Sequence, residues 1–169
     1  MAGRRGQAGV LAAMLAVRGW DARHVPEPSG PAETHGHFVC DDWQESPLGP
    51  QDGPVRLARA LVANTYSGAI EATRTTCAYT IAYTVPEDGS TPTTGFCTGI
   101  QLLTGTVAGR TGTFVLEERA TFTPEGVECA FTVVPTHTAD PLRRLAGSGS
   151  YTARHGERKV AYRFAHELG

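Results

Sequence analysis

One carboxylate in this sequence falls where a strand would bury it. Residues 110–122 alternate with the period of a β-strand, and one face of that strand is apolar. The apolar face consists of Phe114, Leu116, Ala120 and Phe122. Glu118 lies on the same face, between Leu116 and Ala120. An unpaired buried carboxylate is costly and has a raised pKa, so Glu118 either completes a structural hydrogen-bond network or serves as an acid or base.

Polar residues on neighbouring segments are candidates to face Glu118. Gln101 lies on the strand that would pair with residues 110–122, and Tyr79 lies on the long segment before it. We expect Glu118 to be the catalytic residue, as a general acid or base or a hydrogen-bond donor, while Gln101 and Tyr79 position a substrate carbonyl. The full predicted substrate-binding set is Gln101, Tyr79, Tyr83, Glu71, Phe114, Leu116 and Phe131.

Metal and cofactor chemistry find little support in the residue spacing. The cysteines are too far apart for the close ligand pairs of a zinc site: Cys40, Cys77, Cys97 and Cys129. Their even number permits two disulfides, but each lies in a strand-like segment, which favours a role as a small core side chain. His35, His37 and Asp41 share one face of a strand, at an exposed polar edge. No glycine-rich phosphate loop precedes a helix, and we expect no metal and no cofactor.

The composition predicts an all-β chain of one domain. The 169 residues carry a net charge of −2, which gives no basic surface for nucleic acid and no polybasic patch for a membrane. The 20 glycines and 11 prolines, with many Thr, Val and Tyr, indicate strands joined by tight turns. About eight strand-like segments follow residue 33, as in an antiparallel barrel or sandwich. The longest, residues 69–85, should bend or bulge near residues 74–76.

We expect residues 1–32 to form a separate extension ahead of a barrel domain of residues 33–169. Two arginines and the apolar run of residues 10–17 resemble a weak signal peptide, but the run is short and no cleavage site follows. The run is also far too short to span a membrane. The alternatives are a disordered extension and an amphipathic helix that closes the barrel mouth as a lid. We expect a cytoplasmic protein.

Residues 36–169 resemble a bacterial family of uncharacterised proteins, domain of unknown function 3224. The resemblance rests on segments that match in order and spacing: GHFVCDDW, TYSGAIEA, GIQLLTGTVAGRTGTFVLEERATF, FTVVP and LRRLAGSGSY. The members of this family are similar to the allene oxide cyclase barrel. The resemblance therefore implies an eight-stranded antiparallel β-barrel with an internal cavity, and it implies no particular reaction. In the family, the position of Glu118 looks usually like a histidine.

The wider group of similar barrels implies a class of function. It includes plant allene oxide cyclase, dirigent proteins and bacterial cyclases of polyketide-type products, which fold a flexible apolar substrate for ring closure. We expect a cofactor-independent cyclase or isomerase that acts on a hydrophobic polyketide- or oxylipin-like substrate, mainly through proximity. A non-catalytic binder of a small apolar ligand and a structural barrel with a filled interior are the alternatives. The expected partner is a small hydrophobic molecule, not nucleic acid or a membrane, and the chain could form a homodimer.

Overall fold

The structure, a computed structural model, describes residues 33–169, and these form β-strands and connections without a helix. The predicted extension and its helical lid lie in residues 1–32, outside the described residues. The strands are β1 (Glu33–Leu48), β2 (Val55–Gly68), β3 (Ile70–Glu71), β4 (Thr76–Thr84), β5 (Thr94–Val107), β6 (Arg110–Thr123), β7 (Gly126–Val134), β8 (Leu145–Arg154) and β9 (Lys159–Leu168). The predicted all-β class is confirmed. Within the described part, no helix has the length and apolar character needed to cross a membrane.

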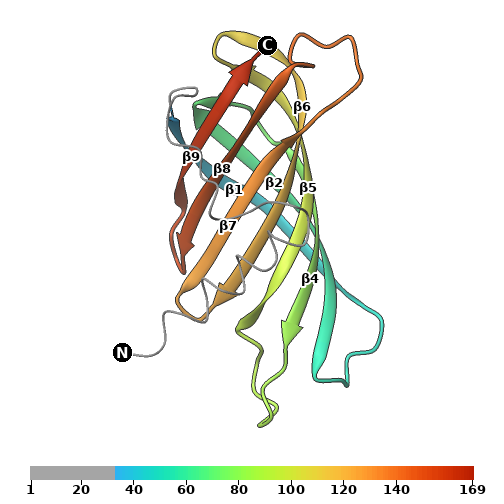
Figure 1. Ribbon diagram of the computed structural model, residues 1–169. Coiled ribbons are helices and arrows are strands. Elements are labelled where there is room, and N and C mark those ends of the chain that lie inside the picture. Colours follow the sequence, from blue (N-terminus) through green and yellow to red (C-terminus); the bar gives the residue numbers. More distant parts are fainter. Residues whose placement is uncertain (1–32) are drawn as a thin grey trace, which may run out of the picture. The chain divides into compact units, whose positions relative to one another are not determined.

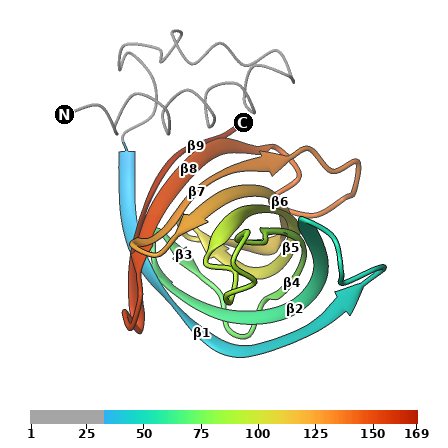
Figure 2. The same cartoon turned by 90° about the horizontal axis from the view of Figure 1, so that it is seen from below.

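The strands form one antiparallel sheet that closes on itself as a ring. The order runs β3-β5-β4-β2-β1-β9-β8-β7-β6, and β6 pairs back with β5. Figure 2 shows the strands encircling a common interior. Closure removes the unpaired strand edges that an open sheet would expose. The expected eight strands become nine because the two-residue strand β3 is separate from β4.

The break between β3 and β4 lies where the sequence predicted a bend. Ile70 of β3 pairs with Val107 of β5, whereas Thr76 of β4 pairs with Leu102. The register thus changes by one residue between the two pairs. Arg74 lies in the interruption with a positive φ of 48°, and its backbone N–H donates to Thr65 Oγ1 at 3.1 Å. The long segment 69–85 is therefore bulged, as expected, but strongly enough to divide it in two.

The hairpin between β5 and β6 has a two-residue turn. Ala108 and Gly109 both have positive φ, 48° and 79°, as in the turns that match the twist of paired strands. This turn makes Val107 the partner of Arg110 and fixes every later pair of the hairpin. By that register, Glu118 lies opposite Gly99.

The larger core fills the half of the ring nearest the β7–β8 connection. Phe114, Leu116 and Phe131 all belong to it and are nearly inaccessible to solvent. The ring of Phe131 packs against the rings of Tyr162 and Phe164 at centroid distances of 6.5 and 5.8 Å. The burial of Phe114 and Leu116 in this core confirms the prediction that the apolar face of residues 110–122 points inward.

The β7–β8 connection helps to close this end of the ring. It contributes Leu142, which is 2% exposed, to the same core. Asp140 anchors the connection, because its carboxylate accepts hydrogen bonds from the N–H groups of Thr113 at 2.9 Å and Leu142 at 2.8 Å. The β4–β5 connection lies at the opposite end of the strands (Figure 1). One end is thus sealed by packed side chains, and the space that remains lies toward the other.

Candidate functional site

A cavity of about 500 Å³ lies inside the ring, on the side of the β4–β5 connection. Its wall is mostly aromatic and aliphatic. It is lined by Phe38, Cys40, Trp43, Val62, Asn64, Tyr79, Ile81, Tyr83, Pro92, Thr93, Cys97, Ala120, Phe122, Val127, Tyr151, Ala153, His155, Glu157 and Val160. The volume and apolar wall are typical of sites for small organic molecules. A completely filled interior, one of the alternatives predicted from the sequence, does not agree with this space.

Tyr79 and Glu118 form a hydrogen-bonded pair at this cavity. The Tyr79 hydroxyl donates to Glu118 Oε2, and the two side chains are 7% and 1% exposed. Tyr79 lines the cavity, whereas Glu118 lies behind it. The predicted burial of Glu118 is therefore confirmed, and its partner is one of the residues proposed from the sequence.

Gly99 makes this pairing possible. Along β5 it is the Cα partner of Tyr79 on one side and of Glu118 on the other. A Cβ atom on Gly99 would lie 2.4 Å from Tyr79 Cδ1, so the tyrosine ring occupies the space that a side chain would need. The Tyr79 side chain can thus extend across β5 to reach the carboxylate on β6. On the cavity side, Trp43 stacks on Tyr79 at a centroid distance of 6.1 Å.

Burial controls the protonation of the pair. Removal from water raises the pKa of Glu118 from 4.5 to about 7, and the hydrogen bond from Tyr79 acts in the opposite direction. Burial also raises the pKa of Tyr79 well above 10, so Tyr79 remains a neutral phenol at pH 7. Near neutral pH the carboxyl group of Glu118 therefore exists in both forms. The ionised carboxylate accepts a hydrogen bond from the Tyr79 hydroxyl, and the protonated carboxyl group can donate a hydrogen bond to the Tyr79 oxygen.

Gln101 belongs to a second buried network and does not hydrogen-bond to Glu118. Its Oε1 accepts from the Tyr66 hydroxyl at 3.0 Å, and its Nε2 donates to Thr75 Oγ1 at 2.6 Å. The side chain is 0% exposed and does not line the cavity. Gln101 faces Leu116 across the hairpin, one inward position further along than Gly99. Through these two hydrogen bonds the Gln101 amide connects β5 to β2 and to the connection that precedes β4.

Of the other predicted substrate-binding residues, one lines the cavity and the rest do not. Tyr83 lines it, and its hydroxyl donates to Glu45 Oε1 at 2.7 Å. Glu71 is solvent-exposed and accepts a hydrogen bond from the Gly68 N–H at 2.8 Å, so it supports the β2–β3 turn and not the cavity. The residues Phe114, Leu116 and Phe131 point inward but lie in the filled half of the ring. An inward direction alone does not make a residue part of the cavity wall.

Asn64 is a cavity residue that the sequence reasoning missed. It is 4% exposed and lines the cavity, and its side-chain amide has no hydrogen bond with any of residues 33–169. The Asn64 amide is not among the fully buried side-chain groups that lack a partner, so it is accessible from the cavity, where a polar atom of a ligand could hydrogen-bond to it. The sequence of β2 does indicate that Asn64 is buried, because Asn64 falls on the same inward face as Ala60 and Val62.

The cysteines provide no activated nucleophile in the described part. All four are free thiols, and Cys97 and Cys40 line the cavity. Burial raises the pKa of Cys97 to about 12, which keeps it protonated at neutral pH. Cys77 and Cys129 are buried among core residues, in agreement with the expected space-filling role. Among residues 33–169, no group of three His, Cys, Asp or Glu side chains is arranged to hold a metal ion.

Fold and site together define a class: a closed antiparallel ring of strands with an apolar cavity and a buried acid paired with a tyrosine. The chain belongs to the family described as "Protein of unknown function (DUF3224)", which its residues 34–166 match. A search of curated proteins found no match. The structure is similar to the crystal structure of a DUF3224 family protein with unknown function from Shewanella oneidensis MR-1, with a TM-score of 0.63 and 23% sequence identity. The match covers 82% of this chain and 98% of that one, and it shows a shared fold.

Proposed function

We propose that this protein is a cofactor-independent isomerase that closes a ring in a small, largely apolar substrate. The observation that carries the proposal is the Tyr79–Glu118 pair at the wall of the 500 Å³ cavity. A general acid or base is most effective when its pKa lies near the working pH, and the pKa of about 7 for Glu118 meets that condition. The apolar wall would bind the substrate, and the pair would move a proton.

Tyr79 is the catalytic residue in this proposal, and Glu118 acts through it. A substrate oxygen that lies against Tyr79 takes the phenol proton as the ring bond forms, and the tyrosine oxygen takes the proton of Glu118. The ring-closed intermediate then loses one proton, which returns to the Glu118 carboxylate through Tyr79. No atom is gained or lost, so the product has the mass of the substrate. This scheme revises the role expected from the sequence, where Glu118 itself met the substrate.

The shape of the cavity supplies the other part of the proposed catalysis. Holding two reactive ends of a flexible molecule together can contribute several kcal/mol to a ring closure. Aromatic side chains enclose this cavity from several strands, among them Phe38, Trp43, Phe122 and Tyr151. The proposal includes the finer assignment of the ring as an eight-stranded allene oxide cyclase-like barrel, which the family resemblance suggested and which fits the closed pairing of β5 with β6. A hydrophobic polyketide- or oxylipin-like molecule remains the proposed substrate class.

Non-catalytic binding of a small apolar ligand is the second candidate, and Asn64 is the observation that favours it. Its unpartnered amide can fix the orientation of a polar ligand atom without taking part in a reaction. In that case the Tyr79–Glu118 hydrogen bond would only stabilise the wall. The two functions therefore differ in whether the pair is needed beyond binding.

Conversion and binding can be measured separately. The wild-type protein would be incubated with apolar extracts of natural products, and chromatography with mass spectrometry would search for products of unchanged mass and altered retention. Binding of decan-1-ol would be measured by calorimetry. Tyr79→Phe and Glu118→Gln should lose conversion and keep decan-1-ol binding, while the exposed control Glu128→Gln should keep both. Wild-type protein that binds but converts nothing would favour the second candidate, and protein that does neither would contradict both.

A further inference from the structure

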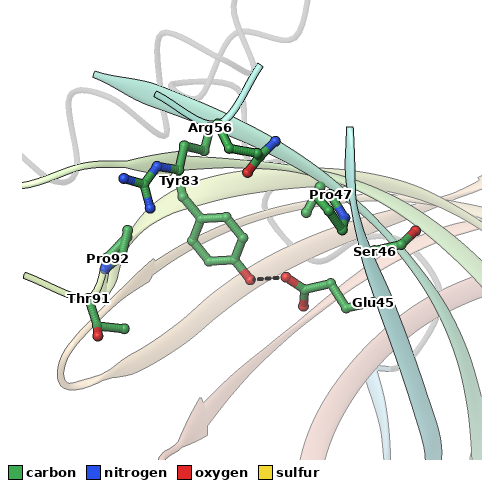
Figure 3. A pocket seen from close by; sticks show the side chains of 9 residues that line it. Glu45, Ser46, Pro47, Arg56, Tyr83, Thr91 and Pro92 are labelled. Carbon is green, nitrogen blue, oxygen red and sulfur yellow. Dashed lines mark hydrogen bonds between the residues drawn. The ribbon is translucent and has the colours of Figure 1, made fainter. Parts of the chain in front are cut away.

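A second cavity of about 410 Å³ lies beside the β1–β2 and β4–β5 connections. It is lined by Glu45, Ser46, Pro47, Gln51, Arg56, Ala58, Tyr83, Thr91 and Pro92. We call it the rim pocket. Tyr83 and Pro92 also line the interior cavity, so the two spaces are separated by shared side chains. Figure 3 shows the Tyr83 hydroxyl directed to Glu45 and the Arg56 guanidinium at the opposite end of the tyrosine, toward Thr91 and Pro92.

Arg56 is the cationic side chain of the rim pocket, and its charge is not compensated there. Its Nε atom is buried and has no hydrogen-bond partner, and no ion pair of Arg56 is found within residues 33–169. A buried donor of a charged group without a partner is costly. Guanidinium groups are suited to carboxylates, which they can bind through two parallel hydrogen bonds. The pocket therefore lacks an anionic partner for Arg56.

Glu45, the acidic residue of the rim pocket, does not supply this partner. Its Oε1 accepts from the Tyr83 hydroxyl at 2.7 Å, and its Oε2 accepts from Trp43 Nε1 at 3.0 Å. Both oxygens are thus occupied by aromatic residues that line the interior cavity. Glu45 holds Tyr83 and Trp43 in the wall, and the Arg56 guanidinium remains available to a ligand.

The geometry points to Arg56 as the site that binds the carboxylate of an amphiphilic acid whose apolar part occupies the interior cavity. This inference rests on the proposed function and specifies its ligand: a molecule with a largely apolar body and one carboxylate at its outer end. Tyr83 and Pro92 line both spaces, so a molecule that extends from the interior cavity past these two side chains would bring its outer end to Arg56. The inward position of Tyr83, opposite Arg56 in the β2–β4 register, places the two side chains next to each other at that boundary.

A matched pair of probes separates the carboxylate from the apolar body. Decanoate and decan-1-ol have the same ten-carbon chain, and calorimetry at pH 8 would give the affinity of each for the full-length protein. Wild-type protein should bind decanoate about tenfold or more tightly than decan-1-ol, because a charge-assisted hydrogen bond contributes to one of them. In Arg56→Met this preference should disappear, so that decanoate binds no more tightly than decan-1-ol, while decan-1-ol binding is retained. Arg59→Met is the control, because Arg59 lies on the opposite, exposed face of β2 and also loses one positive charge.

The outcomes distinguish the inference from the proposed function. Loss of the preference for decanoate in Arg56→Met, with the preference kept in Arg59→Met, supports the inference. An equal preference in wild-type and Arg56→Met would overturn it and leave the interior cavity as a binding site. Failure of the wild-type protein to bind either probe would instead overturn the proposed function, and the assignment of Arg56 with it. Thermal melts of all three proteins would verify that each is folded during the measurement.

Discussion

The substitution Glu118→Gln should make the protein more stable at pH 8. In the folded chain, burial raises the pKa of Glu118 from 4.5 to about 7. The unfolded chain releases this proton near pH 4.5, whereas the folded chain retains it until about pH 7. The unfolded state therefore binds fewer protons in that interval, and the stability contributed by this group decreases as the pH rises through it. Gln keeps an acceptor for Tyr79 and has no proton to lose, so the variant escapes this decrease.

The size of the effect follows from the interval between the two pKa values. At about 1.4 kcal/mol for each pH unit, ionisation of Glu118 costs the folded state about 3 kcal/mol at pH 8. For a chain of this length, that difference corresponds to a rise in melting temperature of about 6–12 °C. At pH 5 the wild-type carboxyl is protonated in the folded protein, and the difference between variant and wild type should be small.

Thermal and denaturant unfolding between pH 5 and pH 9 would test this reasoning. Glu128→Gln is the matched control, because Glu128 is exposed on β7 and its loss changes the net charge equally. The stability of Glu118→Gln relative to wild type should increase with pH and level off above about pH 7. The control should show no such trend. A gain that is absent at pH 8, or equal at pH 5 and pH 8, would refute the argument that burial holds this acid partly protonated.

Three further predictions concern Tyr79, Gly99 and the predicted N-terminal extension. Tyr79→Phe removes the hydrogen bond to Glu118 and should lower stability at pH 8 by about 1–3 kcal/mol, with the pKa of Glu118 raised further, as pH-dependent unfolding would show. Gly99→Ala should displace the Tyr79 ring and lower both melting temperature and decan-1-ol affinity, whereas Gly53→Ala, where the nearest atom to a new Cβ is 3.6 Å away, should change little. Deletion of residues 1–25 should leave the melting temperature unchanged and weaken decan-1-ol binding if this extension is a lid; unchanged binding would contradict the lid.

Much of the fold was predictable because each strand carries its own alternation. Residues 110–122 gave the face, and therefore the burial, of Glu118 without knowledge of any other segment. The pairing of Glu118 with Tyr79 was within reach as well. A two-residue turn at Ala108–Gly109 puts Gly99 opposite Glu118 by counting alone, and a glycine there indicates space for a neighbouring aromatic ring.

The location of the cavity was not predictable in the same way. Alternation separates the inside of a ring from the outside, but it does not show which part of the inside is hollow. That depends on the β7–β8 connection, which inserts Leu142 beside one end of the strands, and on aromatic rings such as Phe131 that extend over Gly149. These contacts join segments far apart in the chain. Gln101 was therefore assigned to the cavity although it lies in the packed region, and Asn64 was overlooked although it lies at the wall.

The free-energy cost of ionising the buried Glu118 carboxyl group bears on its role. A neutral amide at this position could accept the same hydrogen bond from Tyr79, and the worked difference of about 3 kcal/mol favours the amide at pH 8. A purely structural network has no use for an acid that becomes a charge in a buried site near neutral pH. Proton transfer does require such a group, with a pKa in the working range and a partner that reaches the cavity. The presence of an acid at this position therefore supports the proposed role in proton transfer, since function and folding often make opposite demands on one residue.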